Sequence, residues 1–490
     1  MTPPPGVAAR VRRGPVQAGL VAAALGLVWL GGNAGGRGQP ADGPRWLAGD
    51  HHIHSEYSVG WDRTVAPPRL ILGRDAIYSI PRNARMARRY GLEWTVATDH
   101  GGPDHSRVNL EMAYPELLRA REEVPQVVQF FGLELNTPGG DHSSLIVPHG
   151  PEEAQRLHDL EARFDRREAH PVDPSRDTEE KMIAALAAMD GLAPRPVVIA
   201  NHPSRSRSEN GDYGDYDPAE LRRWNDTAPD VAVGMAGAPG HQAAALNPDR
   251  SLRQDRRRGY YTSYPTWGGF DPLTARLGGF WDSMLGEGRR WWITANSDSH
   301  RHFTEGGVDF WPGEYSKTYV HAEKSHAAIL EGLRRGRVFV ATGDLVSELY
   351  VTATSGGGTA DIGGSLPVAP GTDVEVTIRL RDPDAPNPRG YQPTVARVDL
   401  IAGDITGPAP DPARDRNPSA RVVRRFGPDD WSRDGEYRTM RHTLRAVAGD
   451  RYLRVRGTST GEPEPAPDSL GEDPWQDLWF YSNPVFVEVR

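Results

Sequence analysis

Residues 45–55 read "RWLAGDHHIHS", a short apolar run that ends in three histidines. In an extended chain, residues i and i+2 point the same way, so His52 and His54 deliver two imidazoles to one spot and His51 points away from them. Two imidazoles hold a metal poorly on their own. If this stretch ends a strand and begins a metal site, the remaining ligands must follow further along the chain.

Other strand-like runs also end in a histidine or a carboxylate. The runs 196–203, "PVVIANHP", and 289–300, "RRWWITANSDSH", are continuously apolar before their polar ends, as buried strands are. In a β/α barrel the carboxyl ends of the strands converge on one rim, where the chemistry usually lies, so the pattern predicts a metal site there. The residues at these ends are His100 after Asp99, Glu134, His142 at the start of "HSSLIV", His202, Asp298 and His300.

The pattern of strand-like and helical runs along the sequence predicts two domains. From 45 to 342, strand-like runs alternate with helical patterns, which indicates parallel β/α units and an α/β fold. From 345 to 490, strand-length runs are separated by Pro, Gly and Asp, and several alternate apolar with polar residues. This second pattern is typical of an all-β, sandwich-like domain whose sheets have one solvent-exposed face.

Composition narrows the class of protein. The chain has 490 residues, 37% hydrophobic and 25% charged, which fits a soluble globular protein of more than one domain. A net charge of −9 argues against a nucleic-acid partner. There is no cysteine, so disulfides, thiolate zinc sites and Cys nucleophiles are excluded, and any metal is held by His, Asp, Glu or Asn.

The first residues have the layout of a secretory signal. Three arginines precede the apolar run 16–32, and small residues follow it, which predicts a signal peptide over 1–34 and then a linker over 35–44. The run is short for a membrane span, although an uncleaved anchor is the alternative. We therefore expect an exported protein, periplasmic or extracellular, with no stable membrane span after cleavage.

The order HxH, TDH, GLE, GxxH, NHP and SDxH, spread over residues 50–300, resembles the PHP superfamily of metallohydrolases, the polymerase and histidinol phosphatase type. The stretches "GDHHIHS", "NHPSR", "PGEYSKTYV", "GRVFVATGD" and "WFYSNPVFVEV" are similar to the CehA/McbA branch, the carbaryl-hydrolase-like enzymes. Members of that branch are exported and carry a β-rich C-terminal domain.

The resemblance implies a distorted (β/α)7 barrel over 45–342 with two or three divalent ions (Zn, Mn or Fe) at its rim. The implied sites are His52, His54, Glu134 and Asp298 for the first ion, Glu134, His142 and His202 for the second, and His100 with His300 for the third. One departure concerns the third site. The family's Ser-Asp-Gly triplet reads Ser-Val-Gly at 58–60, with Asp62 the nearby acid, so a two-metal site stays open.

Further residues are candidates for catalysis or substrate contact. Asp99, beside His100, could orient an imidazole or merely cap a strand end. Histidines in polar or helical stretches, such as His105, are predicted to be solvated. Arginines near the ligands could bind phosphate, or could be solvated surface residues. These outer candidates are Arg205, Arg207 and Arg301, together with His241 and Asp62.

The ligand set predicts a metal-dependent hydrolase that uses a metal-activated water and no protein nucleophile, since no GxSxG or Walker-type stretch is present. A phosphoester is the preferred substrate. The aromatic stretch 259–270 keeps a carboxylic or carbamate ester as the alternative. A non-catalytic exported protein that binds metal or glycan is the second alternative. We expect a small-molecule ester as partner, and a C-terminal domain that contacts a glycan or cell-wall polymer or serves as a packing or lid domain.

Overall fold

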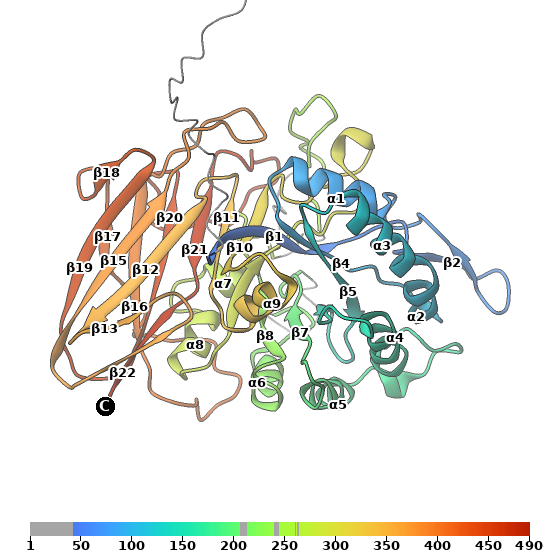
Figure 1. Cartoon of the computed structure of the whole chain (residues 1–490), viewed down its shortest axis with the longest axis horizontal. Helices are drawn as coiled ribbons and strands as arrows, with labels where there is room; N and C mark the ends of the chain where they lie inside the picture. The colour runs from blue at the N-terminus through green and yellow to red at the C-terminus, as the bar shows by residue number, and fades with distance from the viewer. Residues whose placement is uncertain (1–42, 206–212, 240–244, 260, 262–263) are drawn as a thin grey trace, which may run out of the picture. The chain divides into compact units, whose positions relative to one another are not determined.

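The computed structural model describes residues 43–205, 213–239, 245–259, 261 and 264–490, and Gly43–Arg490 form one compact unit (Figure 1). The predicted signal peptide and all but the end of the predicted linker lie outside the described residues. Among those residues, no helix combines the length and the apolar character that crossing a membrane requires.

The centre of the fold is a run of strands that point in one direction. The pairs β1–β4, β4–β5, β7–β8 and β8–β9 are parallel. Strands β7 and β9 are buried along their whole length, as their unbroken apolar sequences require. The bounds are β1 Arg45–Ile53, β4 Trp94–Ala97, β5 Val128–Asn136, β7 Val197–Ala200, β8 Ala232–Ala238 and β9 Trp292–Ala295.

Helices pack against these strands, with α1 against β4, α4 against β5, α6 against β8 and α9 against β7. Several begin at side-chain caps. Ser79 accepts from the backbone N–H of Arg82 at the start of α1, and Thr178 accepts from that of Lys181 at the start of α5. The bounds are α1 Ile80–Arg89, α2 His105–Val108, α3 Tyr114–Glu123, α4 Glu153–Phe164, α5 Glu179–Asp190, α6 Pro218–Thr227, α7 Pro272–Ala275, α8 Phe280–Gly286 and α9 His326–Arg334, with a small hairpin of β2 Gly60–Asp62 and β3 Arg69–Ile71.

Strand β6 (His142–Ile146) corrects the expectation of uniformly parallel units, because it pairs antiparallel with both β5 and β7. Only residues 137–141 separate β5 from β6. A parallel crossover needs a dozen residues or more, so this link can only form a hairpin. As a result, the first residue of β6 lies at the same edge of the sheet as the last residues of β5.

The seven-stranded barrel is not confirmed. The fold is a mixed α/β arrangement in which the ladder path from β1 ends at β9 without closing on itself. The two ends are joined instead by a single parallel bridge between Ile53 and Ser299. Two backbone bonds flank it, from His54 N to Ser299 O and from Asp298 N to His52 O, both 3.1 Å long. This contact brings the polar ends of β1 and β9 together.

The large sheet continues into the C-terminal half, because β11 pairs with β21 and β21 pairs with β20. A separate antiparallel sheet runs in the order β13-β12-β15-β19-β18, and its long strands lie side by side in Figure 1. The bounds are β10 Ser316–Ala322, β11 Val338–Thr342, β12 Glu348–Ser355, β13 Gly358–Ala360, β14 Ser365–Val368, β15 Thr372–Arg381, β16 Arg397–Asp404, β17 Arg421–Phe426, β18 Ser432–Asp434, β19 Tyr437–Val447, β20 Arg451–Thr458, β21 Trp479–Ser482 and β22 Val485–Val489.

The two sheets share one core. In β15 the alternating residues Val374, Val376, Ile378 and Leu380 are buried, and they belong to the same apolar cluster as residues of β16 and β20. Because strands from before residue 342 and from after residue 345 belong to the same large sheet, the division of the chain into two domains at that point stays a prediction.

A buried ion pair links the helical part to the C-terminal strands. Asp282 of α8 accepts from Arg454 of β20 at 2.8 and 2.7 Å and from the hydroxyl of Tyr452 at 3.0 Å. Asp282 and Arg454 are each 1% exposed, so the pair has no competing water. The pair stabilises the contact between the two parts, because loss of either partner would leave a buried charge uncompensated.

One histidine predicted to be solvated is buried. His105, at the start of α2, has Nδ1 at 2.5 Å from Glu161 Oε1 and Nε2 at 2.9 Å from the backbone oxygen of Tyr57. Burial alone would lower the pKa of His105, but the charge of Glu161 and its hydrogen bond raise it to about 9. The polar sequence around it gave no sign that α4 would cover it.

Candidate metal centre

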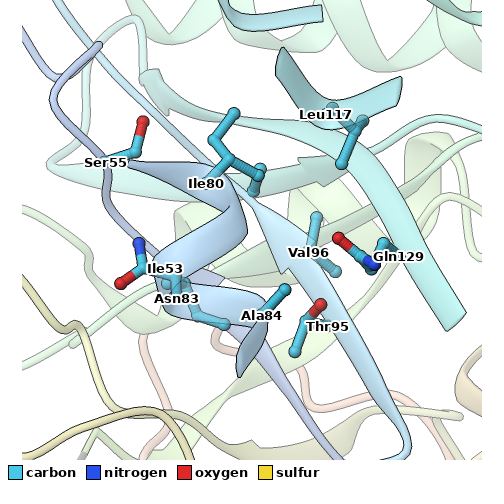
Figure 2. A pocket seen from close by; sticks show the side chains of 10 residues that line it. Ile53, Ser55, Ile80, Asn83, Ala84, Thr95, Val96, Leu117 and Gln129 are labelled. Carbon is cyan, nitrogen blue, oxygen red and sulfur yellow. The ribbon is translucent and has the colours of Figure 1, made fainter. Parts of the chain in front are cut away.

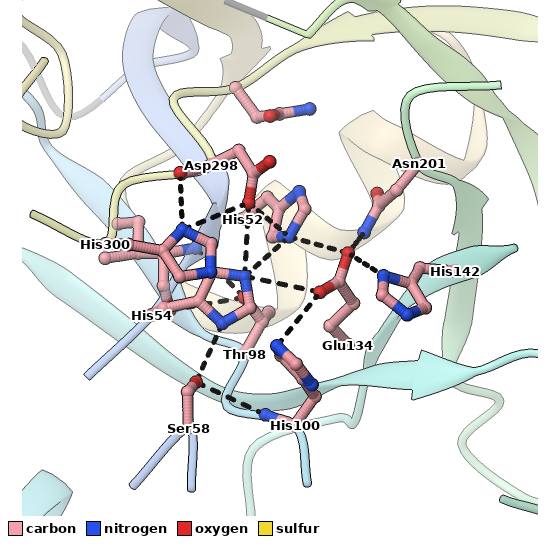
Figure 3. Close-up of polar contacts among 12 residues, drawn as sticks. His52, His54, Ser58, Thr98, His100, Glu134, His142, Asn201, Asp298 and His300 are labelled. Atoms are coloured by element: carbon pink, nitrogen blue, oxygen red, sulfur yellow. Dashed lines mark hydrogen bonds and ion pairs between the residues drawn. The ribbon is translucent and has the colours of Figure 1, made fainter. Parts of the chain in front are cut away.

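The predicted strand ends do converge (Figure 3). His52 lies on β1 and His54 directly follows it, Glu134 lies near the end of β5, and Asp298 follows β9. His142 begins its strand rather than ending it. It reaches the same place because β6 runs against β5, with His142 opposite Asn136.

The first cluster joins His52, His54, Glu134 and Asp298, all of them buried. His52 Nε2 lies 2.9 Å from His54 Nε2, 2.9 Å from Glu134 Oε1 and 3.3 Å from Asp298 Oδ1. His54 Nε2 lies 3.3 Å from Glu134 Oε2 and 3.2 Å from Asp298 Oδ1. Four ligand atoms in a tetrahedron about 2.1 Å from a shared ion lie about 3.4 Å from one another, so these atoms have the spacing of a metal's ligands.

The second cluster shares Glu134 with the first and adds His142 and His202. Glu134 Oε1 lies 3.1 Å from His142 Nδ1 and 3.1 Å from His202 Nε2, and it also accepts from Asn201 Nδ2 at 3.1 Å. A carboxylate with imidazoles of two clusters on either side has the position of a ligand that bridges two ions.

The third cluster contains His54, His100 and His300. Asp75 completes it, with Oδ2 at 2.9 Å from His100 Nε2 and 3.5 Å from His300 Nε2. Asp62 does not take this place, because its carboxylate accepts from Thr64 and from Arg69. Asp75 was missed from the sequence, since it lies in a loop outside every motif, and only its acidic side chain hinted at a ligand.

A buried relay orients His54. Ser58 Oγ donates to Asp99 Oδ1 at 2.8 Å and lies 2.8 Å from His54 Nδ1. Because that hydroxyl gives its proton to Asp99, it can only accept from His54, so the imidazole carries its proton on Nδ1 and turns the Nε2 lone pair toward the cluster. Asp99 also accepts from the backbone N–H and hydroxyl of Ser55. Asp99 therefore lies behind the cluster, where it positions a ligand.

The carboxylates of the site are anionic. Burial alone would raise the pKa of Glu134, but the charges of His142 and His52, with hydrogen bonds from His142 and His202, hold it well below its usual value. Burial opposes ionisation of Asp298 in the same way, and His52 and His54 overcome it. Two ionised carboxylates this deeply buried need cations beside them, and divalent ions satisfy that need.

The backbone is strained at two of the predicted ligands. His202 has φ 29° and Asp298 has φ 48°, which is the left-handed region that residues with a Cβ rarely adopt. Strain of this kind costs about 1–3 kcal/mol per residue and is typical of functional sites. The donor chemistry, the ligand spacing and this strain together fit metal ions held by imidazole and carboxylate.

Arg205 lies beside the second cluster, where its guanidinium is already paired with a carboxylate. Its guanidinium donates to both oxygens of Asp141, at 3.1 and 3.0 Å, and Nη2 lies 3.2 Å from His142 Nδ1. Asp141 Oδ2 in turn lies 3.3 Å from His202 Nδ1. The pair thus braces the second cluster. Asp141 was missed from the sequence, although it directly precedes His142.

The remaining candidates lie elsewhere. Arg301 is exposed, and its Nε donates to the backbone oxygen of Glu305 at 2.7 Å. His51 is buried between Ser144 and Thr294, at 3.0 and 2.8 Å. Arg207 and His241 lie outside the described residues.

A small cavity lies behind Ser55, lined by residues of β1, α1, β4 and α3 (Figure 2). Its volume is about 10 Å³, and its lining is mostly apolar, with Ile53, Ile80 and Leu117 among its walls. This is room for one water at most. The cavity is too small to hold a substrate.

No protein-family profile and no curated protein matches the chain. Among solved structures, it is similar to the crystal structure of Endonuclease Q in complex with a 27-mer duplex substrate with an abasic lesion at the active site. The sequences are 12% identical, the TM-score is 0.33, and the alignment covers 60% of this chain and 56% of the other. A likeness at this level carries no argument about this chain.

Proposed function

We propose that the chain is a metal-dependent hydrolase of the PHP superfamily, in the CehA/McbA branch, that cleaves an ester with a metal-activated water. The observation that carries this proposal is the shared position of Glu134, which joins a four-ligand cluster to a three-ligand cluster. A carboxylate shared by two ligand clusters would help to hold a cation in each of them, which is the arrangement that two-metal hydrolases use.

The second cluster also favours catalysis over a purely structural role. Structural sites are usually closed by four protein ligands, whereas catalytic sites keep a position open for water or substrate. Glu134, His142 and His202 are three ligands and leave such a position. When bound, divalent ions lower the pKa of a water and polarise the ester oxygen.

Residues of the chain supply negative charge and hold the ligands in place. Glu134 and Asp298 stay ionised and hold positive charge at the site, Asp99 and Ser58 fix the tautomer of His54, and Arg205 braces the second cluster through Asp141. Imidazole with carboxylate suits Zn, Mn or Fe. Asp75 supports a third ion beside His100 and His300, in a place the family's triplet does not supply.

Other substrates and one other function are alternatives. A phosphoester is preferred as the substrate, with a carboxylic or carbamate ester next. A non-catalytic exported protein that binds metal or glycan is a separate candidate. We further propose export to the periplasm or beyond, and a lid or glycan-binding role for the C-terminal strands.

Assays of ester hydrolysis distinguish the hydrolase from the binding protein and rank the ester classes. Protein stripped of metal and reloaded with Zn, Mn or Fe is assayed on p-nitrophenyl phosphate, bis(p-nitrophenyl) phosphate and p-nitrophenyl acetate. Loss of a partner behind a metal ligand typically lowers activity by about 10–100-fold, so loss of the ligand itself in Glu134→Gln should lower turnover by about that much or more. Turnover should be unchanged in the exposed control Glu375→Gln. Full metal loading without turnover of any ester would favour the binding protein instead.

A further inference from the structure

A groove of about 1020 Å³ opens beside the metal centre, with His100 in its wall. Residues 59–68, around the β2–β3 hairpin, form one side of the lining, and residues 166–177, after α4, form another. Ligand pockets usually measure about 300–1,000 Å³, so this groove has room for much more than an ester group. It connects the third cluster to solvent.

Arg167 is one of the cations in this groove that are available to bind a ligand. Its side chain lines the groove and is exposed, and its guanidinium makes no hydrogen bond or ion pair with any residue that the structure describes. The neighbouring Arg166 is different, because it pairs with Asp177 at 3.2 Å.

Two carboxylates of the candidate site, Asp141 and Glu134, act electrostatically on Arg167. The walls of the groove partly desolvate this exposed side chain, which together with the charge of Arg166 lowers its pKa, while Asp165, Asp141 and Glu134 act in the opposite direction. The guanidinium stays charged all the same, since an arginine is protonated at any physiological pH.

The rest of the groove combines free positive charge with apolar surface. Arg63, on the hairpin side, is exposed and has no partner among the described residues either. The acids of the lining are engaged, Asp173 by Ser175 and Asp177 by Arg166. Val65 and Val172 line the groove and are 46% and 80% exposed, so their apolar side chains are accessible to a ligand.

We propose that this groove binds the substrate, and that the substrate is an anionic ester, a phosphoester with an apolar or aromatic alcohol group. Arg167 binds the phosphoryl oxygens beside His100, since a planar guanidinium matches phosphate with two hydrogen bonds. Trp61, Val65 and Val172 cover the alcohol group. This inference rests on the proposed function and deepens it, because it selects the phosphoester over a neutral carboxylic or carbamate ester.

Inorganic phosphate, the product, is the probe for the anion site. Its binding to metal-loaded protein is measured by calorimetry for the parent, Arg167→Gln, Arg167→Lys and the control Arg445→Gln, which lies on the exposed face of β19. We expect about a 10-fold or greater loss of affinity in Arg167→Gln, a smaller loss in Arg167→Lys, and none in the control. Equal affinity in the parent and Arg167→Gln would overturn the proposal.

Two esters then separate this inference from the proposed function. Arg167→Gln should lower kcat/KM for p-nitrophenyl phosphate and leave p-nitrophenyl acetate unchanged. Equal effects on both esters, with an active parent, would refute the role of Arg167 and leave the hydrolase intact. A parent that hydrolyses neither ester would refute the hydrolase, and phosphate binding would still decide whether Arg167 binds anions.

The apolar wall has its own test. The double variant Val65→Ser, Val172→Ser is compared with the exposed control Leu470→Ser on 1-naphthyl phosphate and glycerol 2-phosphate. We expect the parent and the control to prefer the naphthyl ester, and the double variant to lose about 10-fold of that preference, because it offers less apolar surface. An unchanged preference would show that the alcohol group lies elsewhere.

Discussion

Ser58→Ala tests how the chain orients a metal-binding imidazole. Ser58 Oγ lies 2.8 Å from His54 Nδ1 and donates to Asp99 Oδ1 at 2.8 Å. With alanine in its place, the Nδ1 proton of His54 has no acceptor and Asp99 loses a donor. All three side chains are buried, so water does not replace the hydroxyl. His54 is then free to turn its lone pair away from the clusters.

The size of the effect follows from these contacts. Loss of the partner behind a ligating histidine typically weakens metal binding by about 10–100-fold. That range is about 1.4–2.7 kcal/mol at about 1.4 kcal/mol per decade. The hydrogen bond from Ser58 to the charged Asp99 contributes about 1.5–3 kcal/mol, which should appear in the unfolding free energy of the metal-free protein.

The assay is competition for zinc against a chromogenic chelator, with urea unfolding of the metal-free protein beside it. Ser58→Thr is the matched control, because it keeps the hydroxyl, and it should retain most of the affinity. A folded Ser58→Ala variant with the parent's zinc Kd would refute the relay from Asp99 to His54.

Three further predictions concern other parts of the molecule. Asp75→Asn should remove one ion per chain, measured by mass spectrometry, while the matched variant Asp62→Asn keeps the parent's count; an equal count in both variants would contradict a third site at Asp75. Asp282→Asn should lower the unfolding free energy by about 3–5 kcal/mol, since it leaves Arg454 as an unpaired buried charge; a loss no greater than that of an exposed Asp→Asn variant would contradict this role for the pair. The raised pKa of His105 makes its contribution to stability complete below its unfolded pKa near 6.5, and that contribution disappears as the pH rises through about 9. The gap in unfolding free energy between parent and His105→Gln, about 3 kcal/mol at pH 6, should therefore close by pH 9 to 10, and a gap that does not change with pH would disprove the charged pair.

The ligand clusters could be predicted from the sequence because the rules that place them are local. Alternation along a strand puts His52 and His54 on one side, and buried parallel strands align their carboxyl ends. His142 was found by its motif, and its position at the start of a strand already hinted at the antiparallel β6. The short link 137–141 carries the same information, since it cannot hold a crossover helix.

Other features depend on contacts between distant segments. Asp75 meets His300 across 225 positions of the chain, and no periodicity links them. Arg205 was a reasonable phosphate ligand by proximity, but the sequence does not reveal that Asp141 engages its guanidinium. The continuation of the large sheet through β11 and β21 likewise pairs strands that lie about 140 residues apart, so composition alone suggested a break there.

Metal content tests the central claim most directly. Protein purified without chelator, and protein reloaded with Zn or Mn, is analysed by mass spectrometry beside His202→Ala, which removes one ligand of the second cluster. The geometry predicts two or three ions per chain in the parent and a lower count in the variant. Less than one ion per chain in the reloaded parent would contradict the metal centre, and the convergence of histidines and carboxylates would need another explanation.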